Sequence, residues 1–142
     1  MVLHKDNTIL IIEDDPLVSG CICDVLQEFG FIICGSASCE PEAVALAERF
    51  RPLLAVTDIN LTGARDGIDI ARALREQFGV RTVFLSGSWS VEMLDRARGA
   101  LPLGILAKPF RPSQMLGVIL QALGPAHSSN SSDAARDNFL PA

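Results

Sequence analysis

Five short apolar runs alternate with segments of helical periodicity, and this alternation restricts the folds open to the chain. The runs occupy residues 9–12, 31–35, 53–57, 82–85 and 103–107. After the first run, Val18, Ile22, Leu26 and Phe29 form one apolar stripe at helical spacing. Strands that alternate with helices predict a parallel sheet with helices on both faces. We therefore expect a doubly wound α/β fold, (βα)5, with five parallel strands in the order 2-1-3-4-5.

Capping signals mark the ends of the expected helices in this flavodoxin-like arrangement. Asp15 followed by Pro16 predicts an N-cap and the first helical residue, and this helix is expected to end near Phe29. In a short fourth helix, Val91, Leu94 and Ala97 fall on one side at positions i, i+3 and i+6. All three are therefore expected to face the core.

Composition describes a single globular domain. The chain has 142 residues, 49% of them hydrophobic, and no apolar run approaches the length of a membrane span. Its net charge of −5 argues against direct binding to nucleic acid or to an anionic membrane. Residues 1–5 do not resemble a secretory signal, so a cytoplasmic location is expected, and the four cysteines are then expected to be reduced thiols. They are Cys21, Cys23, Cys34 and Cys39.

The expected domain covers residues 1–125, with a core at about 6–123. After it, the composition changes to a stretch rich in serine and asparagine with little apolar content. Burial of so few apolar side chains cannot offset the entropy lost on ordering. Residues 126–142 are therefore predicted to form a flexible C-terminal tail.

Polar groups that could take part in phosphoryl transfer follow four of the apolar runs. Glu13 and Asp14 follow the first run, Asp58 the third, Ser86 the fourth and Lys108 the fifth. The ligand crevice of an open parallel sheet lies outside the carboxyl ends of its strands. These side chains are therefore expected to converge in the folded protein.

Three carboxylates at one end of a sheet repel one another unless a cation lies between them. Oxygen ligands of this kind suit Mg²⁺. Asp58 stands alone at the end of its strand and is the best candidate nucleophile, with Glu13 and Asp14 placed to hold the metal. Lys108 and Ser86 could stabilise the charge of a transferred phosphoryl group.

The ordered set of motifs resembles the receiver domain of two-component response regulators, of the single-domain chemotaxis type. The matching motifs are ILIIEDDP at 9–16, TDINL at 57–61, DGI at 66–68, FLSG at 84–87 and KPF at 108–110. The resemblance covers about residues 6–123.

This resemblance implies that Asp58 accepts a phosphoryl group from a sensor histidine kinase or a phosphotransfer protein. It further implies that Asp14 and Asp58 coordinate Mg²⁺ directly, Asn60 through its backbone carbonyl and Glu13 through water. Asp15 is a tempting additional ligand, but the alignment of the apolar strand places the family's acidic pair at Glu13 and Asp14. Asp15 before a proline fits a helix cap better.

The resemblance also implies roles for Ser86, which would bind a phosphoryl oxygen, and for Lys108, which would pair with the phosphoryl group. A cis bond between Lys108 and Pro109 would aim the ammonium back into the crevice. Phosphorylation would alter the face formed by the fourth and fifth strands and helices, which a downstream effector protein reads. A homodimer could form through the fourth helix, fifth strand and fifth helix. No enzymatic turnover of other substrates is expected.

Two positions depart from the family. Thr62 stands where receivers often carry proline, four residues after the phosphoacceptor, which leaves phosphoryl lifetime and partner preference open. Ile105 stands where many receivers have a tyrosine or phenylalanine that couples to the serine or threonine. Any switching must therefore use Ser86 with aliphatic repacking or movement of the loop that carries Trp89, which is expected to be half-buried.

Three alternatives remain open at this point. The chain could be a phosphate shuttle or sink without an effector of its own, and the same residues would serve. It could be a Mg²⁺-dependent aspartyl phosphatase, although such enzymes usually need a second acid where Asn60 stands. Flavin binding is the weakest, because acidic groups occupy the place of a phosphate-binding loop.

Overall fold

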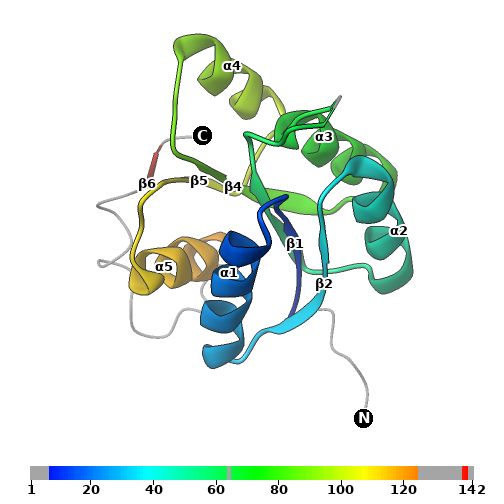
Figure 1. Ribbon diagram of the computed structural model, residues 1–142, viewed down its shortest axis with the longest axis vertical. Coiled ribbons are helices and arrows are strands. Elements are labelled where there is room, and N and C mark those ends of the chain that lie inside the picture. Colours follow the sequence, from blue (N-terminus) through cyan, green and yellow to red (C-terminus); the bar gives the residue numbers. More distant parts are fainter. Residues whose placement is uncertain (1–6, 64, 125–138, 141–142) are drawn as a thin grey trace.

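A computed structural model of the protein describes residues 7–63, 65–124 and 139–140. Five parallel strands alternate with five helices along the chain, as predicted (Figure 1). The strands are β1 (Thr8–Ile12), β2 (Ile32–Ala37), β3 (Leu54–Asp58), β4 (Arg81–Ser86) and β5 (Gly104–Ala107). The helices are α1 (Pro16–Glu28), α2 (Glu40–Phe50), α3 (Gly67–Phe78), α4 (Val91–Gly99) and α5 (Pro112–Leu123).

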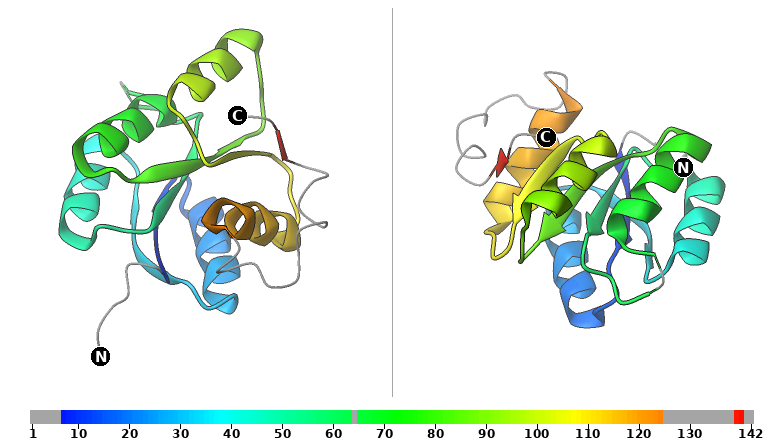
Figure 2. Two further views of the ribbon diagram at one scale, coloured as in Figure 1. Left: turned by 180° about the vertical axis from the view of Figure 1, so that it is seen from behind. Right: turned by 90° about the horizontal axis from the view of Figure 1, so that it is seen from above.

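The sheet divides the core into two faces, because successive side chains of each strand point to opposite sides. Ile9 and Ile11 of β1 belong to the apolar cluster that includes α1 and α5, whereas Leu10 and Ile12 pack with α2 and α3. Figures 1 and 2 show α1 and α5 together on one face of the sheet. A third cluster joins Ile105 of β5 to α3 and α4. Every strand residue of β1 is buried, as both faces are covered.

The parallel strands lie in the order β2-β1-β3-β4-β5, which confirms the predicted topology. A sixth strand, β6 (Phe139–Leu140), was not predicted and pairs antiparallel with Ile105 and Leu106 at the edge of β5. The flexible tail expected at 126–142 stays a prediction: Phe139–Leu140 form this short strand, and the other residues of the range lie outside the described residues. Two apolar residues are too short for a periodic signal, and an edge strand offers unpaired backbone groups wherever a segment reaches it.

Local capping follows the sequence signals. The Asp15 carboxylate accepts a hydrogen bond from the Leu17 N–H at 2.9 Å and so caps α1, as predicted. The expectation for α4 holds for Ala97, which is buried, and is wrong for Val91, which is 76% exposed. Val91 is the first residue after the N-cap Ser90, and the helix meets the core only further along.

No helix within the described ranges is long and apolar enough to cross a membrane.

Candidate functional site

Three carboxylates meet at the carboxyl ends of the adjacent strands β1 and β3. Glu13 and Asp14 follow β1, and Asp58 is the last residue of β3. Each offers an oxygen, and these oxygens all lie within 4.8 Å of one another. Glu13 and Asp58 are each only 5% exposed. The predicted convergence is therefore present, and we call these three residues the acidic cluster.

Lys108 brings a positive charge to the acidic cluster from the end of β5. Its Nζ lies 3.3 Å from Oδ2 of Asp58 and 3.6 Å from Oε2 of Glu13. The Lys108-Pro109 bond is cis, and the Lys108 N–H donates to the Ser86 carbonyl at 2.9 Å. One ammonium against three carboxylates leaves the cluster with a net negative charge. A divalent cation would compensate this charge.

Ser86 lies at the end of β4, fully buried, and its hydroxyl contacts Asn60. Its Oγ donates to Oδ1 of Asn60 at 2.6 Å and also lies 2.8 Å from the Ser88 carbonyl. Asn60 in turn donates its backbone N–H to Oδ1 of Asp58 at 3.1 Å. The structure therefore connects Ser86 to the acidic cluster through Asn60, a side-chain contact that the sequence did not indicate.

The sequence also did not predict two hydrogen bonds to Asp14. The backbone N–H and the hydroxyl of Thr62 both donate to Oδ2 of Asp14, at 3.0 and 2.7 Å. Thr62 and Asp14 are 48 positions apart, so no local pattern could signal the contact. The hydrogen bond from the Thr62 hydroxyl holds the pKa of the Asp14 carboxyl below its ordinary value.

The chemistry of the acidic cluster fits Mg²⁺, which takes carboxylate oxygens and keeps several waters. Oε2 of Glu13 is buried and accepts no hydrogen bond in the described structure; the Lys108 ammonium lies 3.6 Å from it, beyond hydrogen-bond distance. A buried carboxylate oxygen without a donor is costly unless a cation or water satisfies it. Burial, together with the neighbouring Asp58, raises the pKa of the Glu13 carboxyl to about 7. Both features are those of a site that a bound cation would stabilise.

The raised pKa predicts how metal-free stability depends on pH. Between the ordinary pKa of 4.5 and about 7, the folded protein binds a proton at Glu13 that the unfolded chain has lost. The free energy of unfolding should therefore fall by up to about 3 kcal/mol as pH rises through this window, and stay low above it. Mg²⁺ should restore more stability at pH 8 than at pH 5, measured by urea unfolding with EDTA or with Mg²⁺.

Glu13→Gln is the control for this pH dependence, because the amide keeps the shape of the side chain and does not titrate. The variant should show a flatter pH profile between these limits in metal-free buffer. An unchanged profile would mean that another group carries the titration.

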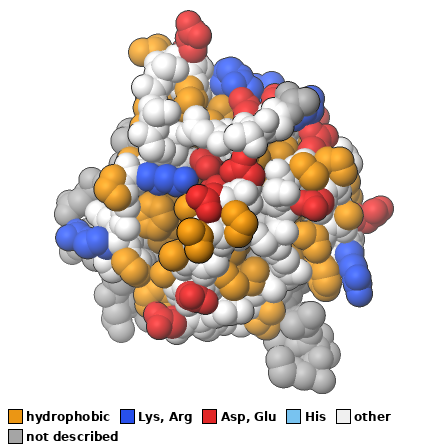
Figure 3. Space-filling model, in the orientation of Figure 1, with side chains coloured by type: hydrophobic (Ala, Val, Ile, Leu, Met, Phe, Trp, Pro, Cys, Tyr) orange, Lys and Arg blue, Asp and Glu red, His pale blue; other side chains and the backbone are white. Residues whose placement is uncertain are grey.

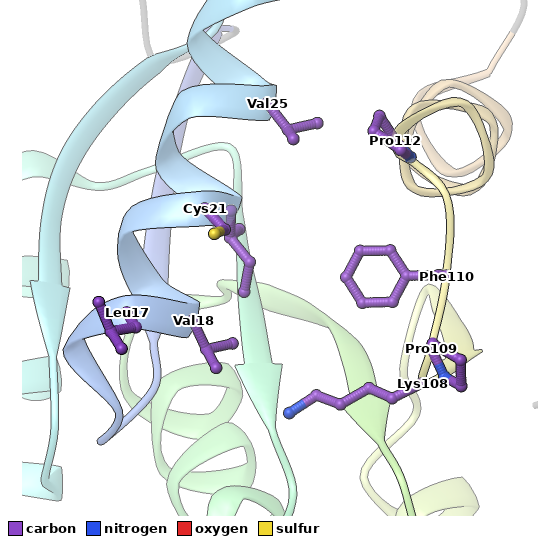
Figure 4. A pocket seen from close by; sticks show the side chains of 9 residues that line it. Leu17, Val18, Cys21, Val25, Lys108, Pro109, Phe110 and Pro112 are labelled. Atoms are coloured by element: carbon purple, nitrogen blue, oxygen red, sulfur yellow. The ribbon is translucent and has the colours of Figure 1, made fainter.

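An apolar groove of about 580 Å³ lies beside the acidic cluster, between α1 and the segment that joins β5 to α5. Figure 4 shows the side chains of Val25, Phe110 and Pro112 facing one another across it. The groove is lined by Leu17, Val18, Cys21, Ile22, Val25, Lys108, Pro109, Phe110 and Pro112. Figure 3 shows acidic side chains gathered near the middle of this face, with hydrophobic side chains next to them. Lys108 thus belongs both to the groove and to the charged site.

Comparison with curated proteins finds response regulators. The chain is 34% identical over 111 residues to the transcriptional regulatory protein PdtaR of Mycobacterium tuberculosis, covering 78% of this chain and 54% of PdtaR. It is 35% identical over 116 residues to the phyllosphere-induced regulator PhyR of Methylorubrum extorquens, covering 81% of this chain and 43% of PhyR. The chain thus spans about half the length of these relatives.

Solved structures show the same fold. The signal receiver domain of a modulated diguanylate cyclase from Desulfovibrio desulfuricans G20 matches with a TM-score of 0.77 and 33% identity, over 82% of this chain and 92% of that one. The receiver domain of Erythrobacter litoralis PhyR matches with a TM-score of 0.72 and 32% identity, over 82% and 89%. The family model of the response regulator receiver domain matches residues 9–120. The chain therefore belongs to the family of response regulator receiver domains.

Proposed function

We propose that the chain accepts a phosphoryl group on Asp58 in the presence of Mg²⁺ and signals this state to another protein. The observation that carries the proposal is the position of the Asp58 carboxylate. It lies 3.3 Å from the Lys108 ammonium and within 4.8 Å of oxygens from Glu13 and Asp14. A nucleophile between a cation and a metal-binding pair is the arrangement that phosphoryl transfer needs.

In the proposed reaction, an oxygen of Asp58 attacks the phosphorus of a phosphohistidine. The new O–P bond forms as the P–N bond breaks, and the bonding electron pair returns to the imidazole nitrogen of the donor. Asp14, Asp58, the Asn60 carbonyl and, through water, Glu13 would hold Mg²⁺, which would neutralise part of the phosphoryl charge. Lys108 lies within reach of a phosphoryl oxygen on Asp58 and would pair with it.

The proposed readout begins at Ser86, whose hydroxyl carries a single proton. When that hydroxyl turns to a phosphoryl oxygen on Asp58, its bonds to Asn60 and to the Ser88 carbonyl are lost. The Trp89 indole N–H donates to the Ser86 carbonyl at 3.1 Å, so the loop before α4 is tied to the same residue. Ser86 and this loop would therefore transmit the change to α4.

The aliphatic Ile105 fits this route. It is fully buried in the cluster that Trp89, Met93 and Leu94 pack against. Trp89 is half-buried, as expected, and is the single tryptophan of the chain. Its fluorescence should therefore change when the site is phosphorylated. An unchanged spectrum in a fully phosphorylated sample would contradict this route.

The direct test of the function is incubation with acetyl phosphate and Mg²⁺. A hydroxylamine-sensitive acyl phosphate should form on Asp58, and EDTA should prevent it. Phosphoryl half-life and transfer back to a phosphotransfer protein would distinguish an effector-linked receiver from a shuttle or sink. Multiple turnover of a phosphomonoester would instead favour the phosphatase alternative.

The groove beside the acidic cluster is the proposed docking surface for the sensor kinase or phosphotransfer protein. It shares Lys108 with the reaction site, and Leu17 at its rim is 81% exposed. An apolar surface this close to the acceptor would hold a donor protein in position for transfer. The effector and a homodimer partner would use the surface of α4, β5 and α5, at the edge of the sheet where β6 pairs with β5. The four cysteines are free, as expected. The cytoplasmic location stays a prediction.

Leu17→Ala should slow phosphoryl transfer from a histidine kinase by about tenfold, because an exposed anchor of this size contributes one to two kcal/mol. The rate with acetyl phosphate should not change, since a small donor needs no docking surface. The measurement compares both donors, using a kinase that phosphorylates the wild type. Leu101→Ala is the matched control, as Leu101 is also exposed and does not line the groove. Equal slowing with both donors would contradict a docking role.

A further inference from the structure

Thr62 makes an unusual contact for an exposed loop residue. It gives two donors, its backbone N–H at 3.0 Å and its hydroxyl at 2.7 Å, to the same oxygen of Asp14. The contact joins the loop that follows β1 to the loop that follows β3. The first of these loops supplies Glu13 and Asp14, and the second follows directly after Asp58, the last residue of β3.

Two donors on Oδ2 have a defined effect on a carboxylate. They restrict rotation of the carboxylate group and leave the lone pairs of the other oxygen available to a cation. They also favour the ionised form, and the pKa of Asp14 is lowered chiefly by the Thr62 hydroxyl. Residues that orient a metal ligand in this way contribute strongly to metal affinity in other sites.

The residue type at position 62 makes this contact possible. Receivers often carry proline here, and proline has neither an N–H nor a hydroxyl. Both hydrogen bonds to Asp14 therefore require a residue other than proline at position 62, where this sequence departs from the family pattern. Thr82 provides a contrast, since its buried hydroxyl has no hydrogen-bond partner in the described structure.

We propose that Thr62 is a positioning residue for the Mg²⁺ site: it holds the Asp14 carboxylate in the orientation that binds the cation. The proposal rests on the function inferred above, because it requires that the acidic cluster binds Mg²⁺. Thr62 itself contacts neither the cation nor the phosphoryl group in this role.

The test measures Mg²⁺ affinity from the rise in thermal unfolding midpoint with Mg²⁺ concentration. Thr62→Val keeps the shape and the N–H but loses the hydroxyl, and should weaken Mg²⁺ binding about tenfold. Thr62→Ser keeps the hydroxyl and should bind nearly as the wild type does. Thr82→Val makes the same chemical change at a hydroxyl without a partner and should leave the affinity unchanged.

The outcomes separate this proposal from the proposed function. Wild-type affinity in Thr62→Val would overturn the positioning role while leaving Mg²⁺ binding intact. Equal weakening in Thr62→Ser and Thr62→Val would also overturn it, since the hydroxyl would not be the cause. If the wild type shows no response to Mg²⁺, the proposed metal site fails and the role of Thr62 with it.

Discussion

Asp58→Asn should abolish phosphorylation by acetyl phosphate or a histidine kinase, with no acyl phosphate detectable under conditions that label the wild type fully. An amide oxygen is a poor nucleophile, and its product would not be an acyl phosphate. The substitution keeps the size of the side chain, and the amide oxygen can accept the same hydrogen bond from the Asn60 N–H. The fold should therefore persist while the chemistry is lost, which circular dichroism would verify.

Trp89 fluorescence provides a second readout of the same substitution. Beryllofluoride, which mimics a phosphoryl group, should change the wild-type spectrum and leave that of Asp58→Asn unchanged. Asp15→Asn is the matched control: it removes a neighbouring carboxylate, but asparagine caps helices as well as aspartate does. This control should still be phosphorylated. A full fluorescence change in Asp58→Asn would show that the acceptor is another residue. Loss of phosphorylation in Asp15→Asn would contradict the assignment of Asp15 as a cap.

Gly67→Ala should destabilise the fold by about 3 kcal/mol and distort the acceptor strand end, since overpacking at a rigid contact costs this much. A Cβ at position 67 would lie 2.0 Å from the Asp58 carbonyl oxygen and 2.9 Å from Cα of Ile59. Both are backbone atoms, so no side chain can rotate away. Urea unfolding would measure the loss, and phosphorylation by acetyl phosphate should slow because Asp58 itself must move.

Gly20→Ala is the matched control for this effect. Gly20 lies within α1, and a Cβ there would meet nothing within 4 Å. Alanine should stabilise the helix by about 1 kcal/mol through its lower backbone entropy in the unfolded chain. A destabilisation equal to that of Gly67→Ala would show that the cost does not arise from the contact with Asp58.

The elements that the sequence predicted correctly have strong local signals. Asp15 and Pro16 mark the start of α1, and the apolar runs mark five strands whose order follows from the rules of doubly wound sheets. The errors concern places where local signals are weak or misleading. Val91 follows the apolar period of α4 yet lies in its exposed first turn, and β6 has only two residues.

The candidate site also has a part that the sequence predicts and a part that it does not. Convergence of Glu13, Asp14, Asp58 and Lys108 was predictable, because each lies at or just after the carboxyl end of a parallel strand and these ends share one edge of the sheet. The hydrogen-bond partners within the site were not predictable. The Ser86 hydroxyl donates to Asn60, 26 positions away, through the conformation of the loop after β3.

The sequence by itself determined the fold, the strand order and the set of residues at the carboxyl edge. Side-chain periodicity and strand ends are local properties, and the few strand orders common among doubly wound sheets limit the topology that they can form. Three contacts were decided only by the tertiary structure. Thr62 donates to Oδ2 of Asp14, Gly67 lies close to the Asp58 carbonyl, and Phe139–Leu140 pairs with β5. These contacts join loops and segments distant in sequence, and their geometry depends on backbone conformations that no local pattern encodes.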